Sequence, residues 1–191
     1  MRSVLIVYGT GDGQTEKIAR YMAHRVDVSG IPVVVVNAAS GANPDPAQFG
    51  GVIVAASVHA GGYQRAVRKW VTRNVDRLNR MPTAFVSVCL GVLQHEPAVD
   101  RDLARIMTAF FDRTRWHPVT REIVAGALKW TQYNPLERWV MRRIVRQAGS
   151  QDLDTSRDYE YTNWDAVGEF VRRFCTEPAA FCTEPDRSAA A

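Results

Sequence analysis

The sequence predicts a doubly wound α/β fold built on a five-stranded parallel sheet. Short runs rich in Val, Ile and Ala alternate with segments of helical spacing almost to the end of the chain, as in successive βα units. The expected strands are nearly continuous apolar runs, which is typical of parallel strands covered by helices on both faces. With 191 residues, 46% of them hydrophobic, the chain suits one domain of this kind.

Five strands and four helices are expected in alternating order. The strands are predicted at residues 3–8, 32–37, 51–57, 83–89 and 122–127. Apolar positions at helical spacing predict helices around residues 18–26, 66–78 and 103–111. The last helix is expected to begin at Thr162, because Asp165 three residues later completes a pattern that resembles a capping box.

One connection is far longer than the others. Roughly 35 residues, about 128–161, separate the fifth strand from the last helix, where a short loop is usual. We therefore predict one domain over residues 1–175 with an insert at about 128–161. In the tail, 176–191, the segment Phe174–Pro178 recurs as Phe181–Pro185. We expect this tail to be disordered and without function.

Charge and composition exclude several classes of protein. The net charge of +4 favours an anionic partner such as lipid headgroups, nucleic acid or an acidic small molecule. Three cysteines cannot form a disulfide framework, and the four histidines lie too far apart for a zinc site, so no metal is expected. No apolar run approaches the roughly 20 residues of a membrane span, and the N-terminal run is too short for a signal peptide. The sequence therefore predicts a cytoplasmic protein.

A glycine-rich loop follows the first strand and opens directly into a helix. In a doubly wound sheet, ligands bind at the carboxyl end of the first strand. Glycines at positions 9, 11 and 13 let backbone amides approach a ligand, the helix N-terminus adds partial positive charge, and two threonines supply hydroxyl donors. These features favour a phosphate-binding loop over an ordinary turn. The predicted phosphate-binding residues are Thr10, Gly11, Asp12, Gly13, Gln14 and Thr15.

The loop suits a mononucleotide better than a dinucleotide. A dinucleotide fingerprint requires a glycine where Gln14 stands and an acidic residue where the second strand ends in Asn37, and the chain contains no Walker A sequence. By analogy with other short doubly wound sheets, FMN is the predicted cofactor. Two further loops at strand carboxyl ends are expected to flank its ring. Their residues are Ser57, Val58, His59 and Gly61, and Ser87, Val88, Cys89, Leu90 and Gly91.

Five segments together carry a resemblance to a known family. They are Thr10–Thr15, Ala56-Ser57 with Gly61 and Tyr63, Met81-Pro82 with Phe85 and Ser87-Val88, Ile123–Leu128, and Tyr161–Trp164. Over residues 1 to about 175 the chain resembles the flavodoxin-like, menaquinone-dependent protoporphyrinogen IX dehydrogenases of haem synthesis. The most specific part is Ile123–Leu128 followed by the long basic insert, which ordinary flavodoxins lack. The loop 89–95 departs from the family because it lacks basic, polar character.

The resemblance implies both a fold and a reaction. It implies a flavodoxin-like fold that binds FMN, oxidises protoporphyrinogen IX to protoporphyrin IX and passes the electrons to menaquinone or ubiquinone. The cofactor carries out such redox chemistry, so no acid–base pair is required, and no catalytic residue is assigned. We expect Cys89 to be a buried small residue rather than a nucleophile, because no histidine is adjacent in sequence to support a thiolate.

The insert carries as much net charge as the whole chain. Residues 129–150 contain five basic residues and one acidic residue. On a helical wheel three arginines form a row opposite an apolar face, and a tryptophan lies at the border, which suits either an anionic membrane surface or a helix packed on its own domain. The resemblance to quinone-reducing enzymes favours a membrane- or quinone-facing role and a peripheral position at the inner face of the cell membrane. The residues concerned are Arg138, Trp139, Arg142, Arg143 and Arg146.

Other partners and functions are ranked lower. No recognition motif supports binding of nucleic acid. A flavodoxin-type electron carrier is an alternative, but such carriers commonly present an acidic docking face, whereas this chain is basic. An FMN-dependent NAD(P)H:quinone reductase is a second alternative, for which the sequence shows no nicotinamide site.

Overall fold

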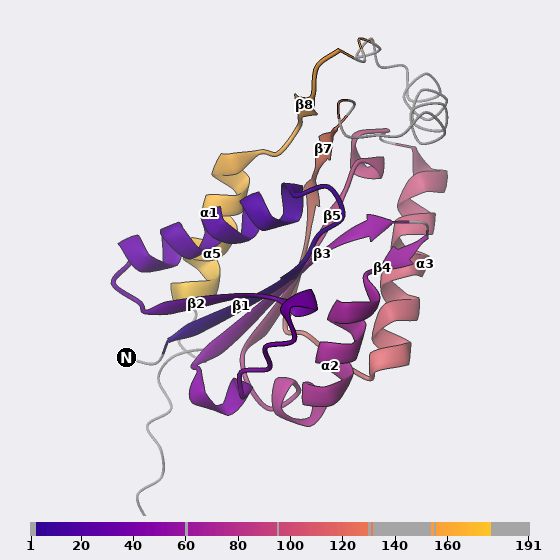
Figure 1. The fold of residues 1–191 in the computed structure, drawn as a ribbon. Helices are drawn as coiled ribbons and strands as arrows, with labels where there is room; N and C mark the ends of the chain where they lie inside the picture. Colours follow the sequence, from indigo (N-terminus) through magenta and orange to yellow (C-terminus); the bar gives the residue numbers. More distant parts are fainter. Residues whose placement is uncertain are drawn as a thin grey trace, which may run out of the picture.

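The computed structural model describes residues 3–59, 61–94, 96–129, 131, 154 and 156–176. Five parallel strands form its sheet in the order β2-β1-β3-β5-β6 (Figure 1). Their bounds are β1 Val4–Gly9, β2 Val33–Asn37, β3 Gly51–His59, β5 Thr83–Cys89 and β6 Thr120–Ala125. A two-residue strand, β4 Gly62–Tyr63, pairs antiparallel with the end of β3. The predicted doubly wound sheet is confirmed, and its strand order switches at β1.

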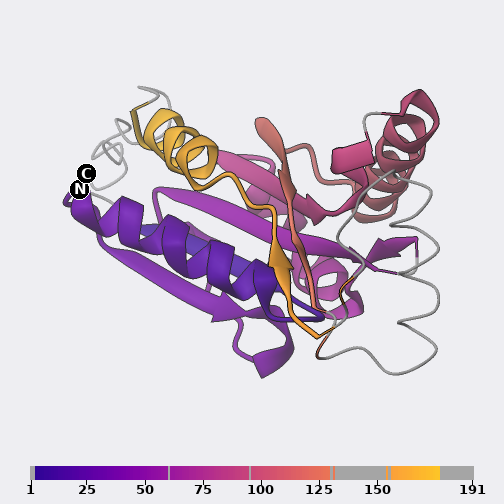
Figure 2. The ribbon, with the colours of Figure 1, turned by 90° about the horizontal axis from the view of Figure 1, so that it is seen from above.

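Helices cover both faces of the sheet (Figure 2). Helices α1 Gln14–Val28 and α5 Trp164–Thr176 pack on one face, and α2 Arg65–Leu78 and α3 Pro97–Thr114 pack on the other. Short 3₁₀ turns lie in the connections: η1 Ala38–Ser40, η2 Pro46–Gln48 and η3 Gly91–Gln94. Each helix places its apolar stripe on the sheet, as the helical spacing in the sequence predicts.

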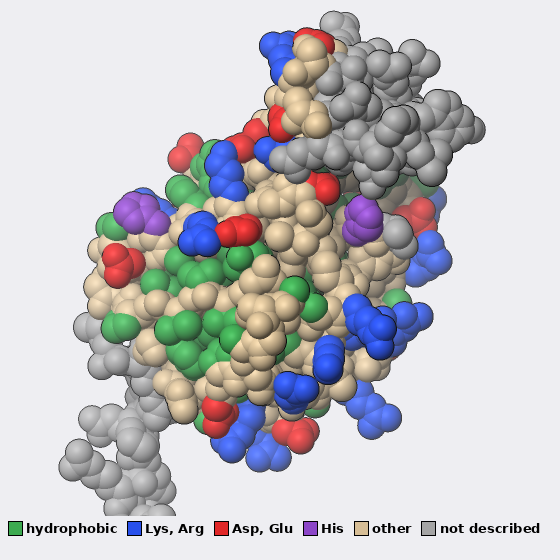
Figure 3. Space-filling model, in the orientation of Figure 1, with side chains coloured by type: hydrophobic (Ala, Val, Ile, Leu, Met, Phe, Trp, Pro, Cys, Tyr) green, Lys and Arg blue, Asp and Glu red, His purple; other side chains and the backbone are tan. Residues whose placement is uncertain are grey.

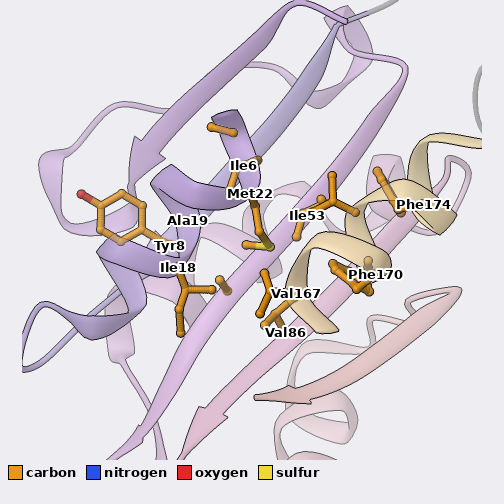
Figure 4. Packing of buried hydrophobic residues seen from close by; sticks show 14 of the residues in the cluster. Ile6, Tyr8, Ile18, Ala19, Met22, Ile53, Val86, Val167, Phe170 and Phe174 are labelled. Carbon is orange, nitrogen blue, oxygen red and sulfur yellow. The ribbon is translucent and has the colours of Figure 1, made fainter. Parts of the chain in front are cut away.

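Successive side chains of the inner strands point to opposite faces of the sheet, and this divides the core into two layers. In β1, Val4, Ile6 and Tyr8 join the cluster under α1 and α5 (Figure 4). Leu5 and Val7 point to the opposite face and join the cluster under α2 and α3. This period of two is intrinsic to an extended strand, and burial of both sets explains why the sequence reads as continuously apolar.

The two edge strands differ from this pattern. Val34 in β2 and Ile123 in β6 are 42% and 41% exposed. An edge strand has a neighbour on one side only, so the covering helices do not enclose it fully. The expectation that both faces of all five strands are covered is therefore wrong for β2 and β6.

The chain leaves the sheet earlier than the sequence predicts. Strand β6 spans residues 120–125 rather than 122–127. After Gly126 the chain forms β7 Ala127–Leu128, which pairs antiparallel with β8 Tyr159–Glu160. The two short strands bring the ends of the insert together, and we call residues 127–129, 131, 154 and 156–162 the neck.

The start of the last helix is a second correction. The Asn163 side chain, not that of Thr162, caps α5, because Asn163 Oδ1 accepts from the Ala166 amide at 3.0 Å. The Thr162 hydroxyl instead donates to the Ala125 carbonyl at 2.8 Å and accepts from Gln14. A partner 148 positions away along the chain cannot be read from a local capping pattern.

Some predictions fall on residues outside the described part of the chain. They include the membrane-facing set Arg138, Trp139, Arg142, Arg143 and Arg146, and all of the predicted tail except Thr176. Among the helices that are described, none is long and apolar enough to cross a membrane.

Candidate functional site

The site lies at the carboxyl edge of the sheet, where the strand order switches. Parallel β1 and β3 end side by side there, with Gly9 opposite Ala56. The β1–α1 loop, the β3–β4 hairpin and the segment after β5 all emerge at this edge, and the neck lies above it in Figure 1. Segments that the sequence predicts to bind phosphate and to flank a ring thus meet at one place.

The β1–α1 loop has the geometry of an anion site. The Thr10 hydroxyl accepts from the Gly13 amide at 2.8 Å, so its own proton is free for a ligand. Gly13 has φ 84°, a left-handed conformation that favours glycine, and no side chain caps α1. The first amides of α1 have no intrahelical partner, and they point at the loop with the positive end of the helix dipole.

An unpartnered hydroxyl tests whether this loop fits a phosphate. Thr15 is 1% exposed, and its Oγ1 is buried without a hydrogen-bond partner. A buried polar group without a partner is costly, and a phosphate oxygen would supply the missing acceptor. The residues present therefore fit a phosphate group held by Thr10, Thr15 and the amides at the start of α1.

Gly9 has a different role from the other glycines of the loop. A Cβ at this position would lie 2.4 Å from Val67 Cγ2 of α2, whereas nothing lies within 4 Å of a Cβ at Gly11 or Gly13. We expected Gly9 to bring an amide close to a ligand, but packing of β1 against α2 already requires glycine here.

The neck is tied to the phosphate loop and to α1 by contacts that local sequence patterns do not predict. Gln14 Nε2 donates to Thr162 Oγ1 at 2.9 Å, and Lys17 Nζ lies 2.5 Å from Glu160 Oε2. Trp164 Nε1 donates to the other Glu160 oxygen at 2.8 Å. No local signal could have revealed these pairs, because about 140 residues separate Lys17 from Glu160.

Electrostatics favour ionised carboxylates in the neck. Burial alone would raise the pKa of Glu160, but hydrogen bonds from Lys17, Trp164 and Gln14 outweigh it and hold that pKa below its ordinary value. Asp158 accepts from the Thr131 amide and hydroxyl at 3.0 and 2.9 Å and lies 3.6 Å from Lys129. Burial alone would raise the Asp158 pKa, but these contacts outweigh it and hold that pKa below its ordinary value.

The β3–β4 hairpin is anchored by Tyr63. Its ring makes edge contacts with Phe85 and Phe110, with centroids 5.0 and 5.1 Å apart, and its Oη is hydrogen-bonded to Ser87 Oγ at 2.8 Å. Burial raises the Tyr63 pKa to about 12, and the hydrogen bond with Ser87 only partly offsets this effect. Tyr63 is therefore neutral at physiological pH and positions the hairpin that contains Ser57, Val58, His59 and Gly61.

The candidate ring-flanking residues differ in how accessible they are. Ser57 Oγ accepts from Gln64 Nε2, and Val58 is half-buried, while His59 and Gly61 are exposed. Ser87, Val88 and Cys89 have buried side chains, whereas Leu90 and Gly91 are partly exposed. Any contact of Ser87 or Val88 with a ring would therefore involve the backbone. Their role in cofactor binding stays a prediction.

Cys89 is buried, as the sequence predicts. Burial raises the pKa of its thiol, although the Gly91 and Val92 amides partly counter this effect. A thiol of raised pKa is a poor nucleophile at neutral pH. Among the described residues, no group of three or more His, Cys, Asp or Glu is placed to hold a metal ion.

The fold and loop define a class of protein: a doubly wound, mononucleotide-type α/β domain with a candidate phosphate-binding loop at the switch point. The chain belongs to the flavodoxin domain family, which matches residues 5–154.

Relatives and solved structures agree with this assignment. The chain is 32% identical over 168 residues to the protoporphyrinogen IX dehydrogenase [quinone] of Escherichia coli strain K12, covering 88% of this chain and 92% of the relative. The enzyme of the same name from Leishmania major is 29% identical over 95% of this chain and 78% of its own length. Flavodoxin 1 of Bacillus cereus superposes with a TM-score of 0.53 at 10% identity, covering 91% of this chain and 97% of that one. At that identity the likeness shows the fold alone.

Proposed function

We propose that this chain is an FMN-dependent oxidoreductase that oxidises protoporphyrinogen IX to protoporphyrin IX and delivers the electrons to a quinone. The observation that carries the proposal is the 32% identity to a protoporphyrinogen IX dehydrogenase [quinone] over 92% of that enzyme's length. The match extends through the neck, which the family resemblance in the sequence also includes. Menaquinone and ubiquinone are both acceptors within this proposal.

The phosphate loop supports FMN rather than a larger nucleotide. Thr10, Thr15 and the amides at the start of α1 form one compact anion site, which suits a terminal phosphate monoester. When bound, FMN would supply the electron-accepting chemistry. The protein's part is placement: the loop holds the phosphate, and the hairpin anchored by Tyr63 and the segment after β5 present backbone groups at the edge where the ring would lie.

Two titratable side chains at this edge are neutral at physiological pH. Tyr63 is neutral and held by Ser87, and Cys89 is a buried thiol. Placement of the cofactor is the contribution we assign to the protein. The arginine row of the insert, outside the described residues, supports peripheral association with an anionic membrane where quinones reside.

Steady-state turnover tests the proposal. The FMN-loaded protein, assayed anaerobically with protoporphyrinogen IX and a water-soluble menaquinone analogue, is expected to form fluorescent protoporphyrin IX at a rate that depends on both. FMN reduction by protoporphyrinogen IX without quinone turnover would point to an electron carrier. Turnover with NADPH and quinone, but none with protoporphyrinogen IX, would point to an NAD(P)H:quinone reductase.

A further inference from the structure

Helix α2 presents a row of cations that no part of the described structure neutralises. Arg65, Lys69, Arg73 and Arg77 recur every four residues and therefore share one helix face, and Arg68 and Arg80 flank that row. Asp76 is the one acidic residue between positions 65 and 80. Figure 3 shows Lys and Arg side chains gathered over α2.

These cations are accessible and have no ionic partner. All are exposed except Arg68, which is partly buried, and none of the six takes part in an ion pair among the described residues. Like charges four residues apart repel each other on a helix, so the row opposes folding of α2 rather than supporting it. A partner that neutralises the row would relieve this repulsion.

The neighbouring helix shows that such a row is not a general feature of this face. In α3, Arg101, Arg105 and Arg113 are interleaved with three aspartates, and Arg105 is paired with Asp102 at 3.2 Å. Two helices on one face of the sheet thus differ sharply in charge. The excess on α2 is a property of that helix and not of the whole surface.

An apolar recess adjoins the row at the end of α2. It has a volume of about 420 Å³ and is lined by Ala47, Phe49, Asp76, Arg77, Arg80 and Met81. Phe49 and Met81 precede β3 and β5, so the recess lies at the amino edge of the sheet, opposite the phosphate loop. It is therefore separate from the cofactor site.

We propose that the cationic face of α2, with the recess at its end, is a docking surface for an anionic phospholipid bilayer. The row spans about 18 Å along the helix at 1.5 Å per residue and turns gradually around it, and its long Lys and Arg side chains can extend to one plane of phosphate groups. Guanidinium groups beside an apolar recess match the phosphate and acyl parts of a phospholipid. A nucleic acid would leave the recess unused, and the aromatic residue of α2, Trp70, is buried and cannot stack on bases.

The test compares two triple variants of equal charge in vesicle sedimentation. Vesicles of phosphatidylcholine with a minority of phosphatidylglycerol are expected to bind the wild-type protein at low salt, and pure phosphatidylcholine vesicles are not. Lys69→Ala, Arg73→Ala and Arg77→Ala together should weaken binding about a hundredfold, given the usual contribution of each basic residue near an anionic surface. The control, Arg25→Ala, Arg101→Ala and Arg113→Ala, removes three exposed cations that form no ion pair in the described structure and should change affinity by no more than about threefold.

The design separates α2 from the insert and from the redox function. Both triple variants retain the insert, so its basic residues contribute equally to both, and no enzymatic activity is measured. Circular dichroism and urea unfolding check that each variant is folded. Equal loss of binding in both variants, absence of wild-type binding to the phosphatidylglycerol vesicles, or tighter binding of duplex DNA than of these vesicles would each overturn the proposal.

Discussion

The phosphate loop and the β3–β4 hairpin lie at the same edge of the sheet but use their polar groups in opposite ways. In the loop, the Thr15 hydroxyl is buried without a partner. In the hairpin, the Tyr63 hydroxyl is bonded to Ser87 and its ring packs on Phe85. An unpartnered buried group destabilises the free protein and strengthens binding of whatever completes it, whereas a satisfied group stabilises the fold. The loop is thus organised for a ligand and the hairpin for rigidity.

Truncation of the hairpin anchor should have the largest effect on stability. Tyr63→Ala removes the ring from between Phe85 and Phe110 and leaves Ser87 without its partner. We expect the free energy of unfolding in urea to fall by about 3 kcal/mol. Tyr63→Phe, which retains the ring, should cost about 1 kcal/mol. If the two variants were equally destabilised, the ring contacts would not be what anchors the hairpin.

Thr15→Val should separate ligand binding from stability. Loss of a hydrogen bond to a charged phosphate should weaken FMN binding by roughly 1.5–3 kcal/mol, or about tenfold to a hundredfold, measured by calorimetry. The urea midpoint of the FMN-free protein should not fall, because the removed hydroxyl has no partner. Thr114→Val in α3 is the matched control: its buried hydroxyl donates to the Phe110 and Phe111 carbonyls and lies away from the loop, so stability should fall while FMN affinity changes little. The reverse pattern would show that Thr15 is a structural residue.

Gly13→Ala tests the left-handed turn that begins α1. With φ at 84°, an alanine should cost about 1–2 kcal/mol in the free energy of unfolding. Gly11→Ala, at a position with equal space but without a positive φ, serves as the control and should have a smaller effect. Equal costs for the two substitutions would mean that backbone strain is not the cause.

The smallest effect is expected from the link between the neck and α1. Because the Glu160 pKa is lowered in the folded protein, its contribution to stability is present above the ordinary glutamate pKa of about 4.3 and is lost as the pH falls through the folded value. Glu160→Gln should reduce stability at pH 7 by a few tenths of a kcal/mol, since Lys17 and Glu160 are 59% and 30% exposed. Urea unfolding at pH 7 and pH 3 should show a difference between wild type and variant only at pH 7.

Local sequence accounts for much of the fold and part of the site. Continuous apolar runs and helical spacing predict the five strands and four helices, and the glycines and threonines at 9–15 predict the phosphate loop. The same local patterns predict that β6 ends two residues too late, because residues 127 and 128 pair with β8 instead of the main sheet. They also predict that α5 begins at Thr162, because the bond from Gln14 of α1 to Thr162 leaves no local signal. It also attributed Gly9 to a ligand, although Val67 of α2 explains it.

The sequence by itself thus determined the fold class and the loop that opens α1, because hydrophobic period, glycine and helix-start chemistry act over a few residues. Only the tertiary structure decided that Ser87 is held by Tyr63, that the neck binds α1 through Gln14 and Lys17, and that Thr15 is buried without a partner. The charges of α2 and α3 can be read from the sequence, and the structure adds that both helices pack on the same face of the sheet. These features depend on contacts between segments that are distant in sequence, and the packing of helices on the sheet determines which of these segments are in contact.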